Sequence, residues 1–182
     1  MPDTCNTPSS FRTTRLVLRR PRLADAPVIF ERYASDPEVT RFLSWPRHTT
    51  VADTRTFIEF SDAEWASWPA GPYLVESRDN VLLGGTGLAF ETPERASTGY
   101  VLARDAWGLG YASEALGGIV TIARALGVRR VQALCHAQHR ASWRVLEKNG
   151  FAREGLLRRH LVFPNLDLRM PCDVLSYALV LA

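Results

Sequence analysis

The sequence predicts a single mixed α/β domain in which helices flank one β-sheet. Its 182 residues, 46% hydrophobic and 23% charged, match one globular domain with a sizeable core. Stretches with alternating polarity occur before, between and after stretches with helical spacing of apolar residues. The expected order is β-α-α-β-β-β-α-β-α-β-β, with residues 1–10 as a loose tail and residues 11–182 as one domain.

The first part of the chain is expected to hold one strand and two helices. Arg15–Arg19 alternates as a strand does. Leu23–Tyr33 has helical spacing and ends before Asp36-Pro37, because a residue that precedes proline avoids the helical region. A second helix starts at Thr50, and residues 43–49 form a loop.

Strands dominate the middle of the chain. Tyr73–Ser77 and Val81–Phe90 read as a hairpin joined at residues 78–80. Glu91–Arg95 is expected to be a second turn, and Thr98–Leu102 the strand that follows it.

The second half is expected to alternate between helix and strand before it closes with two strands. The longest helix opens at Gly110, carries an amphipathic stripe and ends at Gly127, a natural residue for a helix C-terminus. The remaining expected elements are a strand, a helix and two strands: Val128–Cys135, Ala141–Asn149, Leu156–Phe163 and Cys172–Leu181.

Composition excludes several classes of function. No apolar run approaches the roughly 18 residues that cross a bilayer, and the polar first ten residues do not resemble a secretory signal. Cys5, Cys135 and Cys172 lack a C-x-x-C spacing, so reduced thiols and a cytoplasmic protein are expected. The histidines lack metal-ligand spacing, so no metal is expected. The net charge of +3 is spread along the chain, which disfavours nucleic-acid binding and suits a basic rim facing an anionic small molecule.

The stretch WGLGYASEALGGIV, from Trp107 to Val120, contains the most informative motif. Small residues at the start of a helix either permit tight packing or leave backbone N–H groups uncovered for an anion such as phosphate. A dinucleotide-binding turn requires a third glycine where Ser113 stands. A P-loop requires a Gly-Lys-Ser/Thr ending, which is absent.

The same stretch resembles the pyrophosphate motif of the GNAT N-acetyltransferases, Gln/Arg-x-x-Gly-x-Gly/Ala. It corresponds to Trp107–Ala112, with Trp107 in place of glutamine or arginine. The run GxGYASEAL is similar to the branch that includes the ribosomal-protein N-terminal acetyltransferases of the RimJ and RimL type. TTRLVLRRPRLADA at Thr13–Ala26 and RASWRVLEKNGFAREG at Arg140–Gly155 resemble that branch too.

The resemblance implies a mostly antiparallel, splayed sheet that grips acetyl-CoA as co-substrate. Backbone N–H groups of the glycine turn would hold the pyrophosphate, and Val101 and Leu102 would pair with the pantetheine amides as a strand would. The family motif N-x-x-S reads His139-Arg140-Ala141-Ser142, and Leu146 stands where other branches have a tyrosine acid. The expected cofactor-binding residues are Val101, Leu102, Trp107, Gly108, Leu109, Gly110, Tyr111, Ala112, Ser113, His139 and Ser142.

Acetyl transfer from a thioester to an amine requires only modest acid–base help from the protein. An α-amine of pKa about 7.7–8.0 is partly neutral at pH 7 and needs only a weak base, and a departing thiol needs only modest help. Ser142 is the candidate, by resemblance, to meet the departing sulfur, although a helix-capping role explains it equally. Glu91 is the candidate base, although a solvated turn carboxylate is the simpler interpretation.

The sequence therefore predicts an N-acetyltransferase whose acceptor is a protein N-terminus or a small-molecule amine. The alternative is a non-catalytic relative that binds an acyl-CoA or a protein partner, which the missing asparagine and tyrosine favour. The identity of the acceptor, the length of the acyl group, the general base or acid and homodimer formation are left open.

Overall fold

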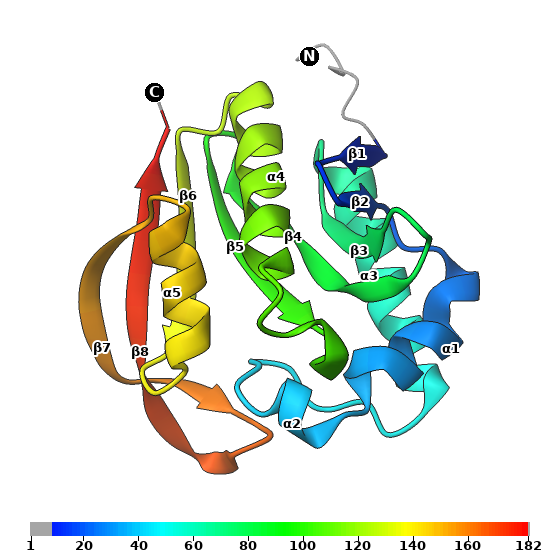
Figure 1. Ribbon diagram of the computed structural model, residues 1–182. Helices are drawn as coiled ribbons and strands as arrows, with labels where there is room; N and C mark the ends of the chain where they lie inside the picture. The colour runs from blue at the N-terminus through cyan, green and yellow to red at the C-terminus, as the bar shows by residue number, and fades with distance from the viewer. Residues whose placement is uncertain (1–8, 182) are drawn as a thin grey trace.

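The computed structural model describes residues 9–181 and contains one eight-stranded sheet (Figure 1). The strands are ordered β1-β2-β3-β4-β5-β6-β8-β7, and only β5 and β6 are parallel neighbours. Their bounds are β1 Ser10–Arg12, β2 Leu16–Arg19, β3 Pro72–Ser77, β4 Leu82–Thr92, β5 Arg95–Leu102, β6 Arg130–His136, β7 Ala152–Phe163 and β8 Asp167–Val180. The predicted mixed α/β fold with a mostly antiparallel sheet is confirmed.

Helices cover both faces of the sheet (Figure 1). The alternation of side chains along β3 shows the division, because Tyr73 and Val75 pack in the cluster that includes α4 while Leu74 packs with Ile29 and Ile58. The helices of the first face are α4 Tyr111–Ala125 and α5 Arg140–Lys148. Those of the second are α1 Ala26–Ile29 and α3 Val51–Ser67. A shorter α2, Pro37–Thr40, precedes the loop to α3.

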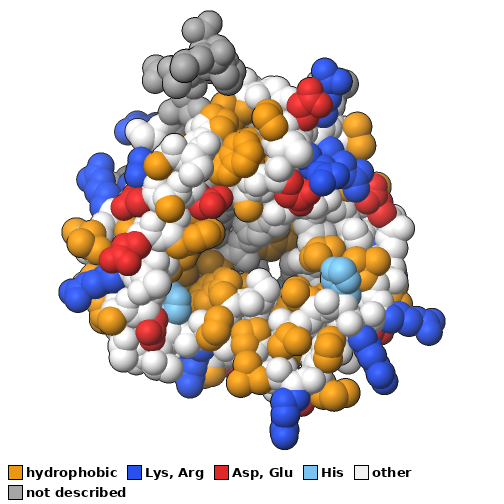
Figure 2. Space-filling view, turned by 180° about the vertical axis from the view of Figure 1, so that it is seen from behind, with side chains coloured by type: hydrophobic (Ala, Val, Ile, Leu, Met, Phe, Trp, Pro, Cys, Tyr) orange, Lys and Arg blue, Asp and Glu red, His pale blue; other side chains and the backbone are white. Residues whose placement is uncertain are grey.

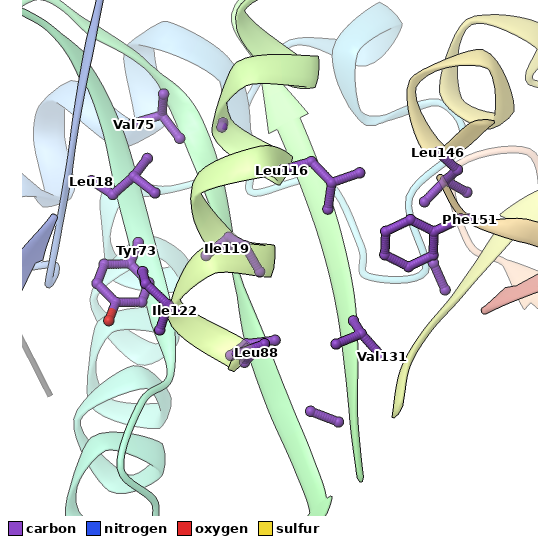
Figure 3. Packing of buried hydrophobic residues seen from close by; sticks show 14 of the residues in the cluster. Leu18, Tyr73, Val75, Leu88, Leu116, Ile119, Ile122, Val131, Leu146 and Phe151 are labelled. Carbon is purple, nitrogen blue, oxygen red and sulfur yellow. The ribbon is translucent and has the colours of Figure 1, made fainter. Parts of the chain in front are cut away.

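The main core lies between α4 and the sheet (Figure 3). Leu116 and Ile119 of α4 are fully buried and pack in the same cluster as Leu18, Val75 and Leu88 of the strands. Burying side chains of this kind supplies about 1.5–3 kcal/mol each. The core therefore holds the N-terminus of α4 in a fixed position over the sheet.

The sheet splays between β5 and β6. Their pairing is limited to Arg95–Ser97 with Arg130–Gln132, although β5 continues to Leu102 and β6 to His136. The second half of each strand therefore diverges, which confirms the predicted splay. The N-termini of α4 and α5 both lie at this divergent end (Figure 1).

Several predicted boundaries are corrected by the structure. Ser10, which the prediction placed in the tail, belongs to β1, and residues 1–8 lie outside the described part. The helical segment predicted at Leu23–Tyr33 is a succession of 3-10, α and π turns. Asp36 ends this segment as predicted. Its carboxylate also caps α2, because it accepts hydrogen bonds from the N–H groups of Glu38 and Val39. Pro37 is accommodated in the first turn of that helix.

The predicted turn at Glu91–Arg95 is tighter than expected. Glu91 is still part of β4, and β5 already begins at Arg95. In residues 9–181 no helix is both long and apolar enough to cross a bilayer.

Candidate active site

The glycine turn before α4 adopts a conformation that side chains disfavour. Gly108 has φ +75° and Gly110 has φ +81°, in the left-handed region that glycine enters without steric cost. Gly110 is the N-cap of α4 and offers no side-chain hydrogen bond to the helix. In contrast, α3 begins with a capping box formed by Thr50 and Asp53. The start of α4 therefore lacks the usual protein partner for its N–H groups.

The backbone N–H groups of this turn are uncovered. Within residues 9–181, no N–H from Gly108 to Ser113 donates a hydrogen bond, and the first to do so is that of Glu114, 3.1 Å from the carbonyl oxygen of Gly110. A Cβ built on Gly108 would meet no atom within 4 Å. The backbone conformation therefore requires glycine at this turn, and within residues 9–181 no atom packs closely against the Cβ position of Gly108.

Other predicted residues of the motif lie around this turn. Trp107 and Leu109 are 48% and 54% exposed. The Trp107 indole Nε1 donates to the carbonyl oxygen of Leu102 at 2.8 Å, which ties the turn to the end of β5. Tyr111 and Ala112 form the first turn of α4, and Ser113 accepts a hydrogen bond from Asn149 Nδ2 of the α5 C-terminus at 3.0 Å.

The gap between the diverging ends of β5 and β6 is called the opening below. Two hydrogen bonds show which residues of β5 face it. The N–H of Ala103 donates to Leu83 of the neighbouring chain segment at 2.8 Å, on the β4 side. The N–H of Arg130 donates to Glu94 at 3.1 Å, on the β6 side. Because a strand directs the backbone groups of alternate residues to opposite neighbours, odd-numbered residues of β5 face β4 and even-numbered residues face β6.

This alternation corrects one of the two predicted pantetheine contacts. Val101 is opposite Gly85 in the β4–β5 ladder, so its backbone groups point away from the opening. Leu102 and Tyr100 direct their backbone groups into the opening, although the Leu102 carbonyl oxygen already accepts from Trp107. The edge available to an added strand therefore contains Tyr100 and Leu102.

Tyr100 and Ser142 meet across the opening. The Tyr100 hydroxyl donates to the carbonyl oxygen of Ser142 at 2.6 Å and lies 3.1 Å from Ser142 Oγ. Burial raises the pKa of Tyr100, so its hydroxyl remains protonated at neutral pH. The N-cap of α5 is His139, which forms no side-chain cap; Ser142 lies within the helix, and its hydroxyl faces Tyr100.

A cluster of rings adjoins Ser142. Phe42 stacks on His139 with ring centroids 4.7 Å apart and lies 4.8 Å from His136, which is itself 4.8 Å from Phe163. Burial lowers the pKa of both histidines, and the His136 Nδ1 accepts from the N–H of Gln138 at 3.1 Å. Both imidazoles are therefore neutral at pH 7.

Asn165 holds the loop that carries Phe42. Its Nδ2 donates to the carbonyl oxygens of Thr40 and Trp45 at 2.7 and 3.0 Å, and its Oδ1 accepts from the N–H of Arg47 at 2.8 Å. The loop at residues 41–49 is thus fastened to the β7–β8 turn. Figure 2, from the side opposite α4 and α5, shows a hollow in the middle of this face with hydrophobic side chains along its lower rim.

Glu91 lies apart from these residues. It is near the end of β4, where it accepts a hydrogen bond from Gln132 and pairs with Arg95 at 2.8 Å. Arg95 begins β5, whereas the glycine turn follows the end of that strand. The structure does not bring the predicted base to the divergent end of the sheet, because β4 and β5 are antiparallel.

Leu146 is 1% exposed and packs in the core near Phe151 (Figure 3). Its side chain is therefore enclosed in the core. A tyrosine at this position would lie in the core.

Reasoning from the sequence missed Tyr100, Phe42, His136 and Asn165 as site residues. Their placement depends on contacts between segments that are distant in sequence, which no local pattern signals. Within residues 9–181 no group of three or more His, Cys, Asp or Glu side chains is placed to hold a metal ion.

Known proteins share this architecture. Residues 15–152 match the family described as acetyltransferase (GNAT) domain. An uncharacterized N-acetyltransferase, p20 of Bacillus licheniformis, is 33% identical over 150 residues, which cover 80% of this chain and 84% of that protein.

Solved structures agree on the fold. RimL, a ribosomal L7/L12 alpha-N-protein acetyltransferase solved in complex with coenzyme A, has a TM-score of 0.82 at 24% identity over 93% of this chain and 96% of its own. The microcin C7 self-immunity acetyltransferase MccE, solved with acetyl-CoA and AMP, has a TM-score of 0.85 at 19% identity over 98% of this chain and 100% of its own.

The family match covers most of the chain and includes the glycine turn, the splayed strands and Ser142. The same family is indicated by the curated relative and by the fold. This chain belongs to the GNAT acetyltransferase family and is an acetyl-CoA-dependent N-acetyltransferase.

Proposed function

We propose that this protein transfers an acetyl group from acetyl-CoA to a primary amine by direct attack within a ternary complex. The acceptor is a protein N-terminal α-amine or a small-molecule amine. The observation that carries the proposal is the row of uncovered N–H groups from Gly108 to Ser113 beside the unpaired edge of β5. The unpaired thiols of Cys135 and Cys172 support a cytoplasmic location.

The residues at the opening suit the parts of acetyl-CoA in order. The N–H groups of Gly108–Ser113 and the positive end of the α4 dipole favour the pyrophosphate, with Trp107, Leu109, Tyr111 and Ala112 around it. The edge groups of Tyr100 and Leu102 take the pantetheine amides. His139 and Ser142 then lie beside the thioester end.

Acetyl-CoA supplies an activated thioester, and the protein positions it and manages protons. The Ser142 hydroxyl, 3.1 Å from the Tyr100 hydroxyl, is placed to donate a hydrogen bond to the departing sulfur. An α-amine with a pKa near 7.7–8.0 is partly neutral at pH 7. The neutral imidazoles of His136 and His139 accept its proton directly or through water, in place of the distant Glu91. Positioning supplies most of the remaining rate.

Isothermal titration with acetyl-CoA tests the site. The wild-type protein is expected to bind, whereas Gly110→Glu places a carboxylate against the pyrophosphate and abolishes binding. Gly127→Glu is the matched control, because Gly127 also has a positive φ, +74°, and open space around it, but it follows the other end of α4. No binding by the wild type, or normal binding by Gly110→Glu, contradicts the proposal.

Release of free CoA thiol tests catalysis. Purified protein is given acetyl-CoA and a panel of peptides and small amines, and an acceptor-dependent release of thiol is expected. Binding of acetyl-CoA without release of thiol from any amine in the panel would contradict the proposed transfer to these acceptors.

A further inference from the structure

Arg15 lies against the glycine turn although it comes from the segment before β2. Its Nη1 donates to the carbonyl oxygen of Leu109 at 3.0 Å. Its Cζ lies 4.6 Å from the centre of the Tyr111 ring. A Cβ built on Gly110 would be 3.4 Å from its Nη2. The guanidinium therefore contacts three consecutive residues of the turn.

Glu114 fixes the orientation of this guanidinium. Its Oε2 accepts from Arg15 Nε at 2.6 Å, and its Oε1 accepts from the backbone N–H of Arg15 and from the Thr13 hydroxyl, each at 2.6 Å. Burial acts to raise the pKa of Glu114, but these hydrogen bonds outweigh it and hold the pKa below its usual value. The carboxylate therefore stays charged and keeps Arg15 in place.

Part of the guanidinium remains available for a ligand. Nε and Nη1 are bonded within the protein, whereas Nη2 donates to no other residue in the range 9–181 and faces Gly110. The Arg15 side chain is 46% exposed. An exposed guanidinium held in one orientation is suited to phosphate oxygens, because its planar N–H groups match their geometry.

The first position of the motif makes this arrangement informative. Trp107 stands where glutamine or arginine is usual in the family, and its only polar side-chain atom donates to Leu102. The motif itself therefore contributes no cation at its first residue. Arg15 brings a cation to the same turn from a segment that is distant in sequence.

We propose that Arg15, held by Glu114, binds the pyrophosphate of acetyl-CoA and supplies the cation that the motif lacks at Trp107. This inference rests on the proposed function. It assigns to the segment before β2 a part in binding the co-substrate. A merely structural Arg15 would tie the segment before β2 to the start of α4 without contacting a phosphate oxygen.

The test compares Arg15→Gln with Arg20→Gln. Arg20 is a matched control, because it also pairs with a carboxylate, Asp62 at 2.6 Å, and lies over an aromatic ring, that of Trp65 at 5.6 Å. The dissociation constants of acetyl-CoA and of acetyl-dephospho-CoA, which keeps the pyrophosphate but lacks the 3′-phosphate, are measured by titration calorimetry. Circular dichroism and thermal unfolding report whether each variant is folded.

Arg15→Gln is expected to raise the dissociation constants of both ligands equally, by about ten- to a hundredfold, as expected for the loss of a charged hydrogen bond. Arg20→Gln is expected to bind both as the wild type does. Arg15→Lys keeps the charge without the planar fork and is expected to lose less affinity. If Arg15→Gln fails to fold, Arg15→Lys is compared with the wild type instead. A several-fold loss of affinity that is equal for the two ligands would then support the assignment.

Three outcomes would overturn the inference: unchanged affinity in the folded Arg15 variant, a loss confined to acetyl-CoA, or an equal loss in Arg20→Gln. A loss confined to acetyl-CoA would place Arg15 at the 3′-phosphate instead. Failure of the wild-type protein to bind acetyl-CoA would count against the proposed function itself and is distinguished by that measurement.

Discussion

The hydroxyl of Tyr100 lies 2.6 Å from the carbonyl oxygen of Ser142 and joins β5 to α5 where β5 and β6 diverge. The same hydroxyl is 3.1 Å from Ser142 Oγ. One phenol therefore sets the position of α5 and the environment of the serine hydroxyl. Both residues are at the opening where the thioester is proposed to lie.

Tyr100→Phe is expected to lower kcat about tenfold and to leave the KM for acetyl-CoA nearly unchanged, because Ser142 loses the group that orients its hydroxyl. The free energy of unfolding is expected to fall by about 1 kcal/mol for the lost hydrogen bond. Steady-state release of CoA thiol and urea unfolding measure the two effects. Tyr177→Phe is the control, since it removes a comparable bond to Glu147 of α5, 2.9 Å long; equal slowing by both variants would contradict the role of Tyr100.

Leu146→Tyr is expected to reduce the free energy of unfolding by about 1–3 kcal/mol, because a larger polar side chain would be forced into a packed core. It is not expected to accelerate acetyl transfer, since the side chain at this position points into the core. Thermal unfolding and thiol release measure both. Arg144→Tyr on the exposed side of α5 should change stability by less than about 0.5 kcal/mol, and a faster, stable Leu146→Tyr enzyme would refute the argument.

Asn165→Asp is expected to loosen the loop at residues 41–49. The aspartate retains an acceptor for the N–H of Arg47 but loses the donor to the carbonyl oxygens of Thr40 and Trp45. The free energy of unfolding is expected to fall by about 1–3 kcal/mol. The KM for the amine should rise while the KM for acetyl-CoA stays constant, because the loop borders the ring cluster and not the glycine turn. Asn80→Asp, in the β3–β4 turn with φ 62°, is the control, and an equal effect there would be the contrary result.

The free energy of unfolding is expected to fall as the pH is lowered through about 6.5. Burial lowers the pKa of His48, His136 and His139 in the folded protein, so the unfolded chain, with a histidine pKa near 6.5, binds more protons in that window. The contribution of these histidines to the free energy of unfolding is fully present above about pH 6.5 and is lost as the pH falls below it. Urea unfolding between pH 7.5 and 5.5 measures the slope, which His139→Gln should reduce; a slope of zero in the wild type would contradict this prediction.

Local features of the chain were readable without the structure. The positive φ of Gly108 and Gly110, the strand before them and the amphipathic helix after them all depend on near neighbours in sequence. Backbone conformation and periodicity act over a few residues, so the turn and most of the elements could be predicted, whereas β1, α2 and the first residues of β5, β7 and β8 were missed. The exposed amides follow from the same local geometry.

The contacts that complete the site required the tertiary structure. Arg15 and Leu109 are separated by 94 residues and Tyr100 and Ser142 by 42, and no local pattern brings such pairs together. The strand register, and not the residue type, turned the backbone of Val101 away from the opening. Antiparallel chain direction placed Glu91 at the far end of the sheet.

The amino-acid sequence alone thus determined where an anion can approach the backbone, since that depends on glycine and on the start of one helix. The folded chain decided which distant side chains surround that place, because strand order and helix packing, summed over the whole core, set their positions. A measured affinity for acetyl-CoA that is insensitive to both Gly110→Glu and Arg15→Gln would show that this location is wrong.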